Sequence, residues 1–490
     1  EPILLLNEAD QFLSSRTSDG LSGSEKMHNQ MQNIFLEQIE RFDGILIATT
    51  NLLENIDKAF SRRFNYKIEF SKPNVEQRKL LWEKLIPENL PLDKDFDIEF
   101  HTRHIRLPEP GDWRQLCIQA ARLHSRPLDL TKPLWEFTVI EGLDDVPGLP
   151  KGCYAILSKI HHACIDGVSG ADITEAIHGL EPFPPAPPEP DKVWKGESTP
   201  NAVELVTRAN INNLSQPFRL AEVMARAVPA MGRFQKGLLQ KKFSVSVQAP
   251  KTRFGGVVSS HRVVEGRSFD LDDIKRIKSM VPGATVNDAV LTIVGGALRK
   301  YLIAKEELPP EPLIAMAPIS VRGEEGKNAL GNQVAAMTVK LGTDIEEPLQ
   351  RLQAVHDAAS SSKEMTKAVG AKLMTDFSQF IPATTAALAT RIYTEMRLAK
   401  RVNFGFNCVI TNVPGPQVPL YSAGAKLVTQ FGLGPIFDGM GLIFPVFSYC
   451  GQITITVNSC RDMMPDPDFF GTCIQESYDE LNALADESVA

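Results

Sequence analysis

Two adjacent histidines, His161 and His162, open the segment HHACIDG, which also holds Asp166 and Gly167. A neutral imidazole can accept a proton from a hydroxyl group and so act as a general base. The Asp166 carboxylate can fix the loop, and Gly167 has no Cβ and therefore permits a tight turn. A metal site and a purely structural histidine pair are the two alternatives. Apart from the neighbouring Cys164, no Cys or Glu stands at a usual zinc spacing, so the pattern favours a general base.

The sequence around this segment predicts a connection between a strand and a helix. Residues 153–160 are largely apolar and predict a buried strand, and residues 170–180 carry apolar side chains at helical spacing. A side chain on such a connection can point into a cleft. Residues 137–143 predict a neighbouring core strand, and Trp135 precedes it. We expect Trp135 to pack against its neighbours and not to take part in the chemistry.

Five segments in a fixed order carry a resemblance to a known family. HHACIDG resembles the HHxxxDG signature of the CoA-dependent acyltransferase superfamily. The accompanying segments are PLWEF at 133–137, VNDAVL at 286–291, PISVR at 318–322 and TNVPGPQVPLYSAGAKL at 411–427. In this order they resemble the bacterial wax ester synthase/diacylglycerol acyltransferase family, over about residues 100–484.

The resemblance implies an O-acyltransferase. Such an enzyme moves a long-chain acyl group from acyl-CoA to diacylglycerol, which gives triacylglycerol, or to a long-chain alcohol, which gives a wax ester. It also implies that His162 is the general base that deprotonates the acceptor hydroxyl, and that His161 holds its neighbour's ring or lines the site. Acyl-CoA is then a substrate, and we expect no cofactor and no metal ion.

The resemblance places further residues near the site, in substrate-binding or structural roles. These residues are Pro133, Leu134, Trp135, Asn287, Asp288 and Arg322. Asn287 and Asp288 lie in the first turn of a helix predicted over residues 285–305, where acidic and amide side chains are favourable as caps. A structural role and a catalytic role therefore both stay open for this pair. Arg322 ends a predicted strand and is a candidate partner for Asp166.

The front of the chain resembles a different family. A strand that ends in Asn7 and Glu8, a second strand that ends at Asn51, and the tandem arginines Arg62 and Arg63 follow the order of the second half of an AAA ATPase domain. The resemblance implies that Glu8 orients water, that Asn51 is a sensor, and that an arginine reaches a neighbouring subunit's nucleotide. Asn7 replaces the usual Asp near magnesium, and no G-x-x-x-x-G-K-[ST] phosphate loop is present. We expect a structural remnant, a docking module or a joining of two coding sequences, and we expect no ATP hydrolysis.

These segments predict four regions in an α/β chain. Residues 1–98 are the partial AAA-type segment without Walker A, and 99–200 are the first acyltransferase subdomain with HHACIDG. Residues 201–260 are a basic helical connector, and 261–490 are the second acyltransferase subdomain. The expected fold is a two-subdomain sandwich of the CoA-dependent acyltransferase type, preceded by the partial AAA-type α/β segment. The cleft between the two subdomains is then the natural site.

Composition limits the partners and the compartment. A net charge of -8 and a pI near 5.7 argue against a nucleic-acid partner, and seven scattered cysteines suit a reducing compartment. No apolar run approaches the ~18 residues of a membrane span. Cations interleaved with apolar residues over 201–242 predict either peripheral contact with a membrane or lipid droplet, or a solvated helix face. We expect a cytoplasmic enzyme, free or peripheral on the inner membrane or on lipid inclusions.

Two alternatives to a lipid acyltransferase remain open. One is a catalytically impaired interaction protein joined to an ATPase remnant, which the replacement of the family's usual front segment favours. The other is a condensation-type domain that acts on carrier-bound thioesters. The segments PLW and NVPGPQVPLYSAGA favour the lipid enzyme over both.

Overall fold

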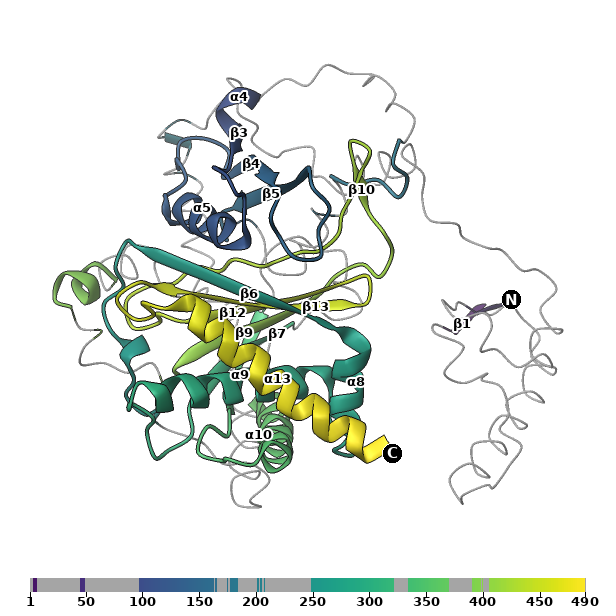
Figure 1. The fold of residues 1–490 in the computed structure, drawn as a ribbon, viewed down its shortest axis with the longest axis vertical. Coiled ribbons are helices and arrows are strands. Elements are labelled where there is room, and N and C mark those ends of the chain that lie inside the picture. The colour runs from purple at the N-terminus through teal and green to yellow at the C-terminus, as the bar shows by residue number, and fades with distance from the viewer. Residues whose placement is uncertain are drawn as a thin grey trace. The chain divides into compact units, whose positions relative to one another are not determined.

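The computed structural model describes residues 3–6, 45–48, 97–162, 164, 174, 177–183, 201, 203–204, 207, 248–320, 334–369, 390–397, 399 and 405–489. The chain divides into two units, Glu1–Pro87 and Glu88–Ala490. In the first unit, β1 (Ile3–Leu6) pairs in parallel with β2 (Ile45–Ala48). All other described elements belong to the second unit (Figure 1).

A small three-stranded sheet begins the second unit. Its order is β3 (Thr102–Arg106), β4 (Trp135–Leu143) and β5 (Cys153–Ile160), with β3 parallel and β5 antiparallel to β4. The short helix α4 (Ile98–His101) leads into β3, and helix α5 (Trp113–Ser125) packs on one face of the sheet. The strands over 137–143 and 153–160 were predicted from their apolar patterns, and the structure confirms both as strands. The expected burial of 153–160 was wrong: β5 ends the described order of the small sheet, and its side chains are half-buried or exposed.

Helix α5 owes its start to a reciprocal cap. The N–H of Gln115 donates to the Asp112 carboxylate at 2.7 Å, and the N–H of Asp112 donates to the Gln115 side-chain oxygen at 3.2 Å. This pair satisfies N–H groups that the start of a helix leaves without intrahelical partners. Farther along the helix, Leu123 is buried in a cluster with Ile140 of β4 and Leu143. The cap therefore starts the helix, and this cluster fixes its apolar face against the sheet.

A six-stranded sheet forms the centre of the second half. Its order is β6 (Arg262–Asp270), β13 (Gln452–Cys460), β12 (Ile443–Tyr449), β9 (Cys408–Pro414), β7 (Ile314–Ser320) and β8 (Val334–Lys340). The pairs β12–β9 and β9–β7 are parallel, and the other three pairs are antiparallel. The strand β6 is therefore an edge strand, and α5 of the first half packs against it.

Helices of the described part of the chain lie on one side of this sheet, opposite the small sheet and α5 (Figure 1). They are α8 (Leu271–Ser279), α9 (Val286–Ala304), α10 (Pro348–Val369) and α13 (Pro467–Val489). Helix α9 is at the centre, because its side chains are buried over nearly its whole length and join the main apolar cluster. An apolar face this wide is typical of a helix that other elements cover on several sides.

A hairpin of the second half also reaches the first half. It consists of β10 (Tyr421–Ser422) and β11 (Ala425–Lys426). Tyr421 and Gly179 exchange two backbone hydrogen bonds of 2.7 and 2.8 Å, and the Tyr154 hydroxyl on β5 donates to the Ser422 carbonyl at 3.3 Å. Residues 177–180, predicted as the end of a helix, instead form a turn and a bridge. Pairing with the hairpin explains this difference.

Candidate active site

His161 and His162 directly follow β5, as predicted. The backbone N–H of His161 donates to the Leu134 carbonyl at 2.9 Å, and the N–H of Cys164 donates to the His161 carbonyl at 2.9 Å. These two bonds fix the chain just before and just after His162. Both imidazoles are exposed. The end of a paired strand thus presents two histidines on a short turn, where a substrate can reach them.

Pro133, Leu134 and Trp135 lie beside the histidines because β4 pairs with β5. Trp135 stands opposite Ile160 in the register, one residue before His161. The N–H of Trp135 donates to the Pro133 carbonyl at 2.8 Å, which bends the chain where it enters β4. Two segments that are separate in the sequence, PLW and HHACIDG, therefore meet through the Leu134–His161 bond. The small sheet brings together these two parts of the predicted site.

The ring of Trp135 is packed among aromatic side chains. It stacks on His101, with ring centroids 4.5 Å apart and planes at 28°, and it lies 5.0 Å from the Phe137 ring. His101 is only 1% exposed, and its Nδ1 lies 2.7 Å from the Trp135 carbonyl oxygen. A carbonyl oxygen only accepts, so Nδ1 carries the proton and donates. His101 could not be identified from the sequence, because nothing in its spacing distinguishes it from a surface histidine.

Lys159 connects the end of β5 to the end of α5. Its Nζ donates to the Leu123 carbonyl at 3.1 Å and also to the Arg126 carbonyl. The last carbonyls of a helix lack intrahelical donors and carry partial negative charge, so an ammonium group is favourable there. Burial lowers the pKa of Lys159. Burial also lowers the pKa of His124 to about 4, and the positive charges of Lys159 and Arg262 add to this effect.

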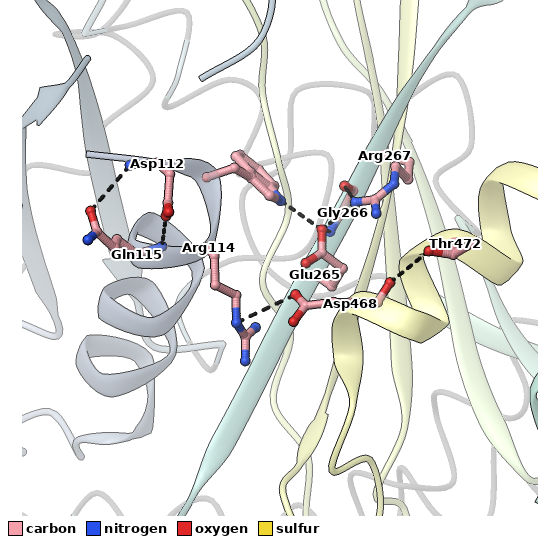
Figure 2. A network of polar contacts seen from close by, with 9 residues as sticks. Asp112, Arg114, Gln115, Glu265, Gly266, Arg267, Asp468 and Thr472 are labelled. Carbon is pink, nitrogen blue, oxygen red and sulfur yellow. Dashed lines mark hydrogen bonds and ion pairs between the residues drawn. The ribbon is translucent and has the colours of Figure 1, made fainter. Parts of the chain in front are cut away.

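The start of α5 is held by a polar network with the second half (Figure 2). The indole N–H of Trp113 donates to Glu265 Oε1 at 2.7 Å, and Arg267 forms an ion pair with the same oxygen. Glu265 is on the edge strand β6 and is only 1% exposed. A second link joins Arg114 Nε to Asp468 Oδ1 of α13 at 3.5 Å. The two halves that carry the family segments therefore contact each other through charged and aromatic side chains.

Asn287 and Asp288 lie in the first turn of α9, as predicted. The Asp288 carboxylate accepts the N–H of Thr285 at 2.9 Å and lies 3.0 Å from His356 Nδ1 of α10. Asp288 is 0% exposed, and its other oxygen, Oδ1, has no hydrogen-bond partner within the described part of the chain. These contacts support a structural role for Asp288. The sequence analysis did not identify His356 as its partner.

The remaining predicted site residues lie outside the described residues. They are Asp166, Gly167, Arg322, Asn7, Glu8, Asn51, Arg62 and Arg63. Most of the predicted basic connector lies outside them as well. Within the ranges that the structure describes, no group of three His, Cys, Asp or Glu side chains could hold a metal ion. Over the same ranges, no helix is both long and apolar enough to cross a bilayer.

Comparison with known proteins identifies the family. The model of the wax ester synthase/diacylglycerol acyltransferase catalytic domain matches residues 67–290, and that of the corresponding C-terminal domain matches 330–482. A putative diacylglycerol O-acyltransferase of Mycobacterium tuberculosis is 31% identical over 396 residues, which are 81% of this chain and 76% of that protein. This chain belongs to the wax ester synthase/diacylglycerol acyltransferase family.

Further comparisons agree with this family and with the fold. The O-acyltransferase WSD of Acinetobacter baylyi is 31% identical over 382 residues, which are 76% of this chain and 78% of that protein. A solved wax ester synthase/diacylglycerol acyltransferase from Marinobacter aquaeolei has a TM-score of 0.54 at 23% identity, and the match covers 85% of this chain and 91% of that one. The predicted α/β acyltransferase-like fold is thereby confirmed. A model of AAA ATPases matches residues 1–72.

Proposed function

We propose that this acyltransferase moves a long-chain acyl group from acyl-CoA to the hydroxyl of diacylglycerol or of a long-chain alcohol, with His162 as the general base. The observation that carries the proposal is the exposed histidine pair directly after β5, held against PLW by the Leu134–His161 hydrogen bond. This geometry occurs in a chain whose two halves both match the family.

In the proposed reaction, neutral His162 accepts the proton of the acceptor hydroxyl as its oxygen attacks the thioester carbonyl carbon. The tetrahedral intermediate then collapses, the C–S bond breaks, and the CoA thiolate leaves. The imidazolium of His162 returns its proton to the thiolate, which regenerates the base. The acyl group passes directly to the acceptor, so no acyl-enzyme forms. Cys164 is exposed but is not needed as a nucleophile.

The acceptor is proposed from the relatives. One relative is named a putative diacylglycerol O-acyltransferase, and the solved structure is named both a wax ester synthase and a diacylglycerol acyltransferase. Both names support a lipid hydroxyl as the acceptor for this chain. Because such acceptors partition into membranes and lipid droplets, we also propose peripheral contact with a lipid surface, through the basic amphipathic sequence over 201–242.

A transfer assay tests this function directly. Purified full-length protein is incubated with radiolabelled palmitoyl-CoA and either hexadecanol or dioleoylglycerol, and the lipid products are separated by thin-layer chromatography. We expect a labelled ester with at least one acceptor, and none when the acceptor is omitted. Folded protein that makes no ester with either acceptor would contradict the proposal and favour the inactive interaction protein.

A further inference from the structure

We propose that Lys159 positions the turn that carries His162, and that helix α5 links this position to the contact between the two halves of the enzyme. The inference rests on the proposed role of His162 as the base. It concerns residues outside the family segments, namely Lys159 at one end of α5 and Trp113 with Glu265 at the other.

Lys159 forms the contact between β5 and the end of α5. Lys159 stands opposite Glu136 in the β4–β5 register, two residues before His161. Side chains alternate along a strand, so Lys159 shares the α5-facing side of β5 with Leu157, which packs on the cluster around Leu123. Its ammonium then reaches the Leu123 and Arg126 carbonyls at the end of the helix. Any displacement of this helix end therefore acts on the last residues of β5, directly before the histidines.

The hydrogen bond from Trp113 to Glu265 anchors the start of α5. A buried carboxylate is costly unless charge and hydrogen bonds compensate it, and Glu265 receives both. Arg267 supplies the charge, while the indole N–H of Trp113 donates from α5 at 2.7 Å. Gly266 leaves no spare room at this contact, because a Cβ there would lie 2.9 Å from the Phe431 ring. The first turn of α5 is therefore held tightly on the edge strand of the large sheet.

Helix α5 itself connects these two contacts, one at each of its ends. Helix α5 has 13 residues, which corresponds to a rod of about 20 Å. Its start is fixed to β6 and α13 by Trp113 and Arg114, and its end is fixed to β5 by Lys159. A rigid helix with these anchors sets where the histidine turn lies relative to the second half. A misplacement of about 1 Å can cost on the order of 100-fold in rate, so such an anchor affects catalysis without touching substrate.

The first experiment compares two variants of Lys159 in the full-length protein. Lys159→Met removes the donor but keeps the aliphatic chain, whereas Lys159→Arg keeps donors for the two carbonyls. We expect Lys159→Met to lower kcat about 10- to 100-fold with little change in KM for acyl-CoA, and Lys159→Arg to restore most of kcat. Lys151→Met, in the exposed turn before β5, is the matched control and should keep the wild-type kcat.

The second experiment tests the path through α5. Trp113→Phe keeps an aromatic ring at this position and removes the N–H that Glu265 accepts, together with part of the indole. We expect a smaller loss of kcat than in Lys159→Met. The double variant should lose less than the product of the two single losses, because both changes release the same helix. Circular dichroism and the melting temperature report whether each variant folds. If Lys159→Met does not fold, the kcat of folded Trp113→Phe still tests the path through α5.

The outcomes separate this inference from the proposed function. Ester formation that survives His162→Ala would overturn the proposed base. A wild-type kcat in folded Lys159→Met, in an enzyme that His162→Ala inactivates, would overturn the positioning role alone. A low kcat that Lys159→Arg does not restore would overturn it as well. Losses that multiply fully in the double variant would mean that the two sites act independently and that α5 does not connect them.

Discussion

Asp288, in the segment VNDAVL, is a buried carboxylate that contacts two helices. Its carboxylate caps α9 through the N–H of Thr285 and faces His356 of α10, so one side chain joins the start of one helix to the middle of another. A cap and a buried partner both stabilise a fold without any contact to substrate. The Asp288 carboxylate therefore has a structural role that is sufficient to explain its place in the segment VNDAVL.

Replacing Asp288 tests this structural role. Asp288→Ala should lower the free energy of unfolding by about 1–3 kcal/mol, because the cap is lost and His356 loses its partner. Asp272→Ala is the matched control in the first turn of α8, where the carboxylate is 83% exposed and pairs with Lys275. It should change stability by about 0.5 kcal/mol or less. Urea unfolding measures both; an unchanged stability with lost ester formation would make Asp288 a catalytic residue instead.

The limits of sequence reasoning are clearest at single residues. The HHACIDG and PLW residues stood out by type and spacing, and the pairing of β4 with β5 brings them together. Lys159, Glu265 and His356 did not stand out, because each acts through a partner far away in the sequence. An ordinary lysine or glutamate carries no sign of such a partner until the fold is known.

At the scale of elements, periodicity predicted most of what positions the site. The largely apolar run of 153–160 predicted β5, and the capped apolar run of 285–305 predicted α9, which spans Val286–Ala304. Helix α10 was not predicted, because its run AASSSK interrupts the apolar spacing of an amphipathic helix. The contact of α5 with β6 was not predictable either, since it depends on how two separate halves pack.

Helix α5 should make stability depend on pH through His124. Its pKa is about 4 in the folded chain, mainly because it is buried, against 6.5 for an ordinary histidine. Between these values the unfolded chain binds a proton that the folded chain does not, so stability is present near pH 7 and falls as pH falls towards 4. The loss from this residue between pH 7 and 5 is about 2 kcal/mol.

Urea unfolding at pH 7 and pH 5 measures this effect. His124→Gln should lose less stability than the wild type over this interval, because glutamine does not titrate. His104→Gln is the matched control on β3, where the imidazole side chain is 64% exposed, and it should keep the wild-type dependence on pH. Equal losses in the wild type and His124→Gln would contradict the assignment.

At the scale of the whole molecule, the acyltransferase region and the front of the chain match different families. The acyltransferase models together match most of the region after residue 67, while the AAA model matches residues 1–72. In the front unit, the two described strands pair in parallel, as the apolar runs around Leu5 and Ile47 allow. Both family matches were therefore expected from the sequence, and so was the two-part α/β fold of the enzyme.

The front unit gives a prediction about nucleotides. The 490 residues contain no G-x-x-x-x-G-K-[ST] segment, whose backbone N–H groups cradle phosphates in P-loop proteins. We therefore expect this chain to show no heat of binding when it is titrated with ATP and magnesium. A micromolar dissociation constant in that titration would contradict the expectation and would give Glu8, Asn51 and Arg62 a functional role.

The measurement that tests the central claim most directly is ester formation by His162→Ala. The variant is compared with wild type and with His161→Ala, each shown to be folded by its melting temperature, with the acceptor that wild type uses best. We predict that His162→Ala lowers kcat by about 10²- to 10⁴-fold, because proton transfer by a positioned base contributes that much, and that His161→Ala loses less. A folded His162→Ala protein that keeps most of its activity would contradict the account.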